Sequence, residues 1–208
     1  FSNMTRADWA RSIELWREHG APLLATLHPR GCPSCGASAS DYIFDSYDGY
    51  PYHECQDCRT WFVPLDVRHE VFERYFTIRP DARRFGDYTD AQAVENAAMD
   101  ADRARFEGYY SALKSCLGRD AGQAPTTLDV GCGVANSLAV AADHGFAAEG
   151  IEVNAHAVNL ARGMGRAVNF PGEPTRAERF AAVTMWETLE HISDPLAALQ
   201  DAHARLLP

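Results

Sequence analysis

The sequence has no long hydrophobic run, no surplus of positive charge and no internal repeat over its 208 residues. No apolar segment approaches the ~18 to 20 residues that cross a bilayer, and no secretory signal is visible, so we expect a cytoplasmic protein without a membrane partner. Nineteen Lys and Arg stand against 29 Asp and Glu, a formal net charge of −10. A nucleic-acid partner is not expected, because binding a phosphate backbone requires a basic face.

Cysteine is scarce, with six residues, but four of them form a pattern. Two Cys-x-x-Cys pairs are separated by 19 residues, which is typical of a four-cysteine zinc ribbon: Cys32, Cys35, Cys55 and Cys58. The alternatives are disulfides, which suit a cytoplasmic chain poorly, or a redox pair, which would not come twice. Four thiolates leave no open coordination position, so the expected Zn²⁺ is structural. His53 is expected on the ribbon surface rather than as a ligand, and Cys116 and Cys132 in apolar surroundings.

Aromatic residues are dense around these pairs. Short strands are predicted at 42–44 and 50–52, joined through the turn signal Asp48-Gly49, and at 60–64. The aromatics exceed what so small a module can bury. We therefore expect them to pack on a neighbouring domain or to line an acceptor pocket.

The most informative segment is 128–152. A strand-like Leu128-Asp129-Val130 enters Gly131-Cys132-Gly133-Val134-Ala135, and Gly150-Ile151-Glu152 ends a second strand. Glycine lets a strand turn into a helix beside a bound ligand, and a carboxylate at the tip of the second strand accepts the two hydroxyls of a ribose. This order predicts a nucleotide-cofactor site. The alternative is a structural βαβ unit without a ligand.

Two residues favour S-adenosylmethionine over a dinucleotide. Asn136 stands where a dinucleotide fingerprint requires its third glycine, and Asp129 would repel a pyrophosphate but suits the ammonium of a methionine. The segment resembles motif I of class I S-adenosylmethionine-dependent methyltransferases, in which a hydrophobic-acidic-hydrophobic-Gly-Cys-Gly run is usual. Ala135 departs from that motif, because glycine is usual there.

A second segment, 180–195, is similar to the fourth strand and following loop of the same superfamily. The resemblance implies a buried strand from Phe180 to Met185 and a loop from Trp186 to His191 that borders the methyl donor and the acceptor. Asp194-Pro195 is expected to begin the next helix. A similar ribbon precedes the catalytic domain in certain sugar and natural-product methyltransferases.

Matching positions to the family implies roles for further residues. Gly131 and Gly133 would approach the amino-acid part of the donor through their backbone, and Asp129 would meet its ammonium. Glu152 would bind the ribose, and Val153 would pack on the adenine. Glu173 would contact the adenine amine, and Trp186 would begin the loop that borders the donor.

Methyl transfer from sulfonium to a hydroxyl needs a general base, and His191 is the candidate. The alternative is a histidine that holds the loop through a backbone hydrogen bond. Glu187, Glu190 and His191 have spacings of three and four, so on a helical turn they would share one face and could bind Mg²⁺ or Mn²⁺. This run resembles that of metal-assisted small-RNA and ubiquinone-pathway O-methyltransferases, which makes Glu187 a second catalytic candidate.

The expected fold is α/β, a Rossmann-like methyltransferase sheet preceded by a zinc ribbon and a helical segment. Residues 1–30 are assigned to a tag remnant and N-terminal helix, 31–65 to the ribbon, 66–125 to a helical connector or lid, and 126–208 to the cofactor domain. Strands are predicted at 126–130, 147–151, 167–170 and 180–185, and helices at 91–117, 135–144, 154–163 and 195–206. Since a complete sheet of this family has about seven strands, we expect a chain cut after the fourth.

The function predicted from the sequence is methyl transfer from S-adenosylmethionine to a small-molecule acceptor, a sugar or natural-product hydroxyl or carbon. One rival is a noncatalytic module in which the ribbon recruits a partner and the cofactor fold is vestigial. The other is an NAD(P)-dependent oxidoreductase, which Asn136 and Asp129 disfavour. The sequence leaves the acceptor atom and the oligomeric state open.

Overall fold

Two units make up the part of the chain that the computed structural model describes, which is residues 14, 18, 27–46, 50–66, 91–117 and 124–208. One unit spans 1–87 with 193–196, and the other spans 88–192 with 197–208. Among the described residues, none of the helices has both the length and the apolar character needed to cross a membrane. Several predicted features lie outside the described residues: most of the N-terminal helix, the turn at Asp48-Gly49, and residues 67–90 of the helical connector or lid.

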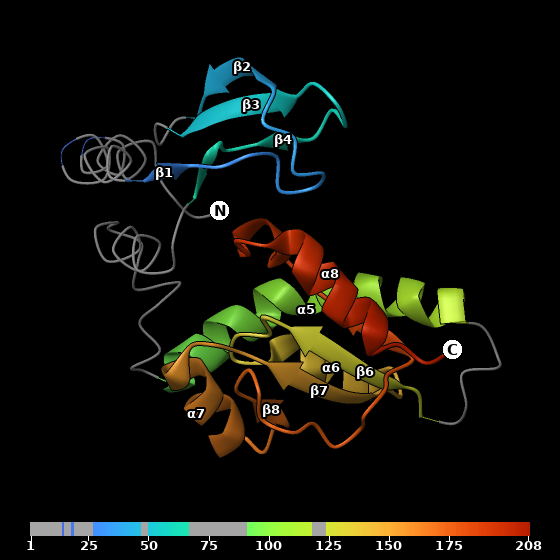
Figure 1. Cartoon of the computed structure of the whole chain (residues 1–208). Helices are drawn as coiled ribbons and strands as arrows, with labels where there is room; N and C mark the ends of the chain where they lie inside the picture. The colour runs from blue at the N-terminus through green and yellow to red at the C-terminus, as the bar shows by residue number, and fades with distance from the viewer. Residues whose placement is uncertain (1–13, 15–17, 19–26, 47–49, 67–90, 118–123) are drawn as a thin grey trace. The chain divides into compact units, whose positions relative to one another are not determined.

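The first unit contains two small antiparallel sheets (Figure 1). In one, β1 (His28–Pro29) pairs with β5 (Leu65–Asp66); in the other, β3 (Pro51–Cys55) is central between β2 (Ser40–Asp45) and β4 (Trp61–Phe62). The three strands predicted around the cysteine pairs are therefore present, with bounds that differ by a few residues. Among the described residues of this unit, Cys32, Cys55 and Phe62 are buried together.

The second unit is built on a four-stranded parallel sheet of order β8-β7-β6-β9. Its strands are β6 (Thr126–Val130), β7 (Ala147–Ile151), β8 (Val168–Asn169) and β9 (Ala182–Thr184). All four lie within the predicted ranges, and the first two have the predicted bounds. Leu128 is fully buried, as a central parallel strand covered on both faces requires. The carboxyl ends of β6, β7 and β9 meet at one edge, where the candidate residues lie.

Helices connect and cover these strands (Figure 1). They are α5 (Ala91–Leu117), α6 (Asn136–Asp143), α7 (Ala155–Gly163) and α8 (Pro195–Ala204), close to their predicted ranges. Phe106 and Tyr110 of α5 pack on α6 in one buried cluster, and α6 packs on α7 in a second. Ala148 of β7 contacts both clusters, so α5, α6 and α7 cover the same face of the sheet. The predicted α/β Rossmann-like fold is confirmed.

Candidate functional site

The turn between β6 and α6 reverses the chain within five residues. Every second residue in it has a left-handed backbone, with φ of 76° at Gly131, 56° at Gly133 and 63° at Ala135. Glycine adopts such angles freely, whereas alanine is strained there by roughly 1 kcal/mol. Ala135 is nevertheless fully buried at the N-cap of α6, where it offers no side-chain hydrogen bond.

Two glycines are required here by close contacts, and Gly131 is required by its backbone angle as well. A Cβ on Gly131 would lie 2.4 Å from the Cγ2 of Thr188, in the loop after β9. A Cβ on Gly150 of β7 would lie 2.3 Å from the sulfur of Cys132. The first turn is thus packed between the end of β7 and the loop after β9.

Asp129, near the end of β6, is buried with its carboxylate inside a hydroxyl network. Thr184 donates to its Oδ1 at 2.9 Å, and Ser137 of α6 donates to its Oδ2. Burial raises the pKa of Asp129 to about 6, against the opposing effect of the two hydroxyl donors. The carboxylate lies at the predicted edge, but both of its oxygens already accept hydrogen bonds from the protein.

Glu152 connects the end of β7 to the first turn. Its Oε2 accepts from the amide of Gly133 and its Oε1 from the amide of Asn154, each at 2.8 Å. A carboxylate has about four lone-pair positions, so two remain for further donors. The next residue, Val153, is 63% exposed, an apolar side chain open beside this carboxylate.

Glu173, the residue assigned to the adenine amine, binds other partners. Its Oε2 accepts from the amide of Phe170 at 2.8 Å and from Nη2 of Arg162 at 2.5 Å. The hydrogen bond from the Phe170 amide and the Arg162 guanidinium hold the pKa of Glu173 below its usual range. The guanidinium also lies over the ring of Phe170, 5.4 Å from its centroid, so Glu173 closes a local cluster after β8.

Sequence reasoning missed two residues that support the site. Nη1 of Arg166 donates to the carbonyl of Val134 at 2.5 Å and to Oδ1 of Asn136 at 3.0 Å, so it fastens the first turn to α6. Glu149, buried within β7, accepts from the amides of Arg176 and Ala177 at 2.7 and 3.0 Å. A charged residue in an apolar strand was the available signal for Glu149.

The loop after β9 carries the catalytic candidates. Trp186 is stacked on Tyr109 of α5, with ring centroids 4.4 Å apart and planes 12° apart. Glu187 forms an ion pair with Arg105 of α5 and has a left-handed backbone, φ 51°. His191 ends the short 3₁₀ helix η2 (Leu189–His191), its side chain is exposed, and its amide donates to the carbonyl of Thr188 at 2.9 Å.

The three residues considered for Mg²⁺ do not gather. Among the described residues, only the cysteine quartet places three or more His, Cys, Asp or Glu ligand atoms close enough to share an ion. Glu190 and His191 lie on η2, whereas Glu187 precedes it and pairs with Arg105. Because η2 begins only at Leu189, Glu187 is not part of the helical turn that would have placed all three side chains on one face.

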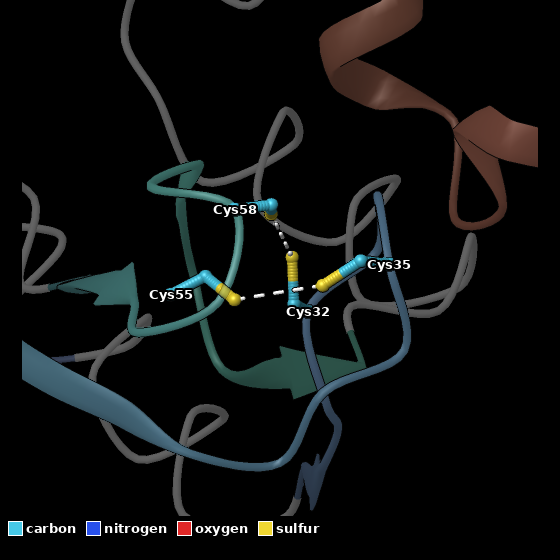
Figure 2. A group of neighbouring side chains, drawn as sticks. All are labelled: Cys32, Cys35, Cys55 and Cys58. Carbon is cyan, nitrogen blue, oxygen red and sulfur yellow. Dashed lines mark hydrogen bonds between the residues drawn. The ribbon is translucent and has the colours of Figure 1, made fainter.

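The two cysteine pairs of the first unit converge on one point (Figure 2). The sulfurs of Cys32 and Cys58 are 3.5 Å apart, those of Cys35 and Cys55 are 3.6 Å apart, and all four lie within 4.8 Å of one another. None is in a disulfide. Four sulfurs at ~2.3 Å from a tetrahedral Zn²⁺ would be about 3.8 Å apart, so the donor set fits this ion.

The two knuckles have the same backbone design. In each knuckle the amide of the first cysteine donates to the carbonyl of the residue five positions later: Cys32 N to Ala37 O at 2.8 Å, and Cys55 N to Thr60 O at 2.9 Å. The residue before that partner is left-handed in both, Gly36 at φ 79° and Arg59 at φ 64°. Two such loops facing each other present four sulfurs to one centre.

Part of the ribbon's aromatic surface is exposed within its own unit. Tyr42 and Trp61 are each 58% exposed. Phe44 stacks on Tyr52 at 5.1 Å and meets Trp61 edge-on at 6.2 Å, which forms a continuous aromatic face. The expectation that these rings pack on another domain or line an acceptor pocket stays a prediction.

Several solved structures are similar to this chain. One is CalS10, an amino pentose methyltransferase from Micromonospora echinaspora bound to S-adenosylmethionine (23% identity, TM-score 0.41, 50% of this chain and 47% of that one). Others are DesVI of Streptomyces venezuelae (20%, TM-score 0.42, 58% and 53%) and the plantazolicin methyltransferase BpumL with S-adenosylhomocysteine (17%, TM-score 0.42, 64% and 52%). The chain spans about half the length of these structures. No curated protein sequence gives a significant match.

The sequence itself also matches a known protein family. Residues 99–208 match the family described as "Methyltransferase domain". The matched region contains the turn after β6, the Glu152 carboxylate and the loop after β9. Because it takes in more than half of the chain, this protein belongs to the methyltransferase domain family.

Proposed function

We propose that the protein transfers a methyl group from S-adenosylmethionine to a small-molecule acceptor, a sugar or natural-product hydroxyl or carbon. The observation that carries the proposal is the Glu152 carboxylate, held by the amides of Gly133 and Asn154 at the edge where β6 and β7 end. Its two remaining acceptor positions suit the two hydroxyls of a ribose. The exposed Val153 beside it offers an apolar surface for the adenine.

The amino-acid end of the donor is assigned to the turn after β6. Gly131 and Gly133 let the backbone approach the ligand, and the carboxylate of Asp129 supplies negative charge for an ammonium. A nearby cation favours the charged carboxylate, so donor binding should lower the pKa of Asp129 from about 6. Trp186 borders this end from the loop after β9. Glu173 is assigned to the adenine amine, because Arg162 and the amide of Phe170 both bind its Oε2 and hold the side chain in place.

When bound, the donor would supply a methyl group on a sulfonium; an aligned nucleophile would bond to the methyl carbon in line as the carbon–sulfur bond breaks, with the neutral thioether as the leaving group. The protein's main task is alignment and exclusion of water. His191 is proposed as the general base for a hydroxyl acceptor, because its side chain is exposed on η2 and histidine is the side chain that most often serves as a general base. The acceptor class rests on the family resemblance and on the acidic balance of the chain, which suits neither a phosphate backbone nor a polyanion.

Calorimetric titration with S-adenosylhomocysteine tests the donor site. We expect micromolar binding to the wild-type protein, loss of at least tenfold in Glu152→Ala, and unchanged affinity in the control Glu178→Ala, which removes an exposed carboxylate of the same unit. NADH should not bind. Binding of NADH instead would favour the oxidoreductase, and a folded protein that binds neither would favour the noncatalytic module.

The cysteine quartet is proposed to hold one structural Zn²⁺, on the fit of its sulfur spacing to a tetrahedral site. Metal analysis of the purified protein should give one zinc per chain, lost in Cys32→Ser. Cys116→Ser is the matched control, because Cys116 is exposed on α5 and lies in the other unit. Four freely reactive thiols and no zinc in the wild-type ribbon would contradict this assignment.

A further inference from the structure

Helix α5 presents one face to the loop after β9. Arg105 and Tyr109 are four residues apart, so they are neighbours on one face of the helix, and Tyr110 follows about 100° further round it. All three interact with the two loop residues Trp186 and Glu187. The loop is therefore attached to a helix more than 70 residues earlier in the sequence.

The contacts are of two kinds. Trp186 is stacked on Tyr109 and meets Tyr110 edge-on, with centroids 6.2 Å apart and planes at 73°. Aromatic pairs of these geometries stabilise by about 1 kcal/mol beyond the area they bury. Glu187 adds a charge contact through its ion pair with Nη1 of Arg105.

The backbone at Glu187 is strained. A φ of 51° is rare for a residue with a side chain and costs about 1 kcal/mol, so it persists only where surrounding contacts enforce it. On the N-terminal side the indole of Trp186 is held by the two tyrosines. On the C-terminal side the hydroxyl of Thr188 donates to the carbonyl of Trp186 at 3.0 Å and lies 3.4 Å from the carbonyl of Gly131.

Glu187 thus connects α5 to the turn after β6, through its own ion pair and through the next residue, Thr188. The Arg105 pair fixes the Glu187 side chain, and the next residue, Thr188, packs where a Cβ on Gly131 would be. A backbone change at Glu187 would shift Thr188, and a shifted Thr188 would alter the contact at Gly131.

We infer that Arg105 is a positioning residue for donor binding: its ion pair with Glu187 holds residues 186–188 in the conformation that supports the turn at Gly131. Glu187 is then an anchor of the loop rather than a group that reacts with the acceptor. This inference rests on the proposed donor site. It assigns to α5 a role in setting donor affinity, which Arg105 exerts through Glu187.

The test is S-adenosylhomocysteine titration of the whole chain at low salt. Partly exposed ion pairs contribute up to about 1 kcal/mol, which corresponds to about fivefold in a dissociation constant. We expect Arg105→Ala and Glu187→Ala each to weaken binding about three- to fivefold, and the double variant to be no weaker than either single one. Arg103→Ala is the matched control, because Arg103 lies on the same helix but pairs with Glu107 and Asp143.

A charge exchange separates positioning from general loss of structure. Arg105→Glu and Glu187→Arg should each weaken binding, and the two together should recover to within about twofold of wild type. The difference between wild type and Arg105→Ala should disappear near 1 M salt, where charges are screened within about 3 Å. Thermal unfolding of each variant shows whether it is folded.

Two results would overturn the inference while leaving the donor site intact. One is wild-type affinity in Arg105→Ala, and the other is a charge-exchanged double variant as weak as the sum of its single changes. If the wild-type protein itself does not bind S-adenosylhomocysteine, the proposed function fails first and the inference fails with it.

Discussion

Gly150 of β7 and Cys132 of the first turn are packed so closely that a Cβ on the glycine would lie 2.3 Å from the cysteine sulfur. Cys132 is half-buried, and burial together with the charges of Asp129 and Glu152 raises the pKa of its thiol far above the ordinary value. The thiol is therefore expected to act as an uncharged space-filling group under the turn. The pair sets the distance between the turn and the second strand.

This contact predicts a specific rescue. Gly150→Ala should destabilise the protein by about 1 to 3 kcal/mol, because the new methyl group overpacks the contact. Adding Cys132→Ala should recover most of that loss, because it removes the sulfur that clashes. Urea unfolding of the two single variants and the double variant measures the effect, and strictly additive losses would mean that the two residues do not share one space.

The buried carboxylate of Asp129 predicts a pH dependence. Its folded pKa of about 6 lies above the ordinary value near 3.8, so between these values the folded state holds more protons than the unfolded one. Stability from this group is therefore full below about pH 4 and falls as pH rises to about 6. The pKa difference corresponds to a cost on the order of 3 kcal/mol at neutral pH.

Asp129→Asn removes that titration. Its unfolding free energy should fall less between pH 4 and 6.5 than that of the wild type, as followed by urea unfolding across this range. Glu178→Ala, which changes an exposed carboxylate, should keep the wild-type slope. Identical slopes for Asp129→Asn and the wild type would show that Asp129 titrates normally in the fold.

Ala135 is an alanine at a position that favours glycine. Ala135→Gly should raise the unfolding free energy by up to about 1 kcal/mol, since the relief of left-handed strain exceeds the entropy that glycine adds to the unfolded chain. Ala141→Gly within α6, which is helical, should instead destabilise by about 1 kcal/mol. Thermal unfolding of both variants gives the sign of each stability change. A loss of stability in Ala135→Gly would contradict the inferred strain at Ala135.

The hydroxyl of Tyr110 is buried without a hydrogen-bond partner among the described residues, and burial raises its pKa to about 12. A buried polar group without a partner costs about 1 to 3 kcal/mol, so Tyr110→Phe should leave stability unchanged or raise it. Tyr109→Phe, whose ring is partly exposed, is the control and should change little. A loss above 1 kcal/mol in Tyr110→Phe would show that the hydroxyl is paired, for example through a buried water.

The sequence identified the elements of the cofactor half because their signals are local. Apolar runs ending in Gly131 and Glu152 define β6 and β7, and Pro195 marks the start of α8. The cysteine quartet was equally readable, because each knuckle is encoded in four consecutive residues.

The sequence could not predict contacts between side chains that are far apart in the chain. Glu187 was grouped with Glu190 and His191 by spacing, yet its carboxylate pairs with Arg105, 82 positions away. The family position of Glu173 predicts a contact with the donor, but the sequence does not reveal that Arg162 and the amide of Phe170 bind its Oε2. Local spacing predicts which face a side chain occupies on a regular helix, and Glu187 lies before η2 with a left-handed backbone.

The Glu149 carboxylate within β7 has a consequence for protease sensitivity. It binds the amides of Arg176 and Ala177, so the backbone on both sides of the trypsin-cleavable bond after Arg176 is tied to the sheet although the Arg176 side chain is exposed. A protease needs an extended stretch of free backbone in its groove. We therefore expect cleavage after Arg176 only when this backbone is released from Glu149 of β7. The cleavage rate would then measure how often this part of the sheet opens.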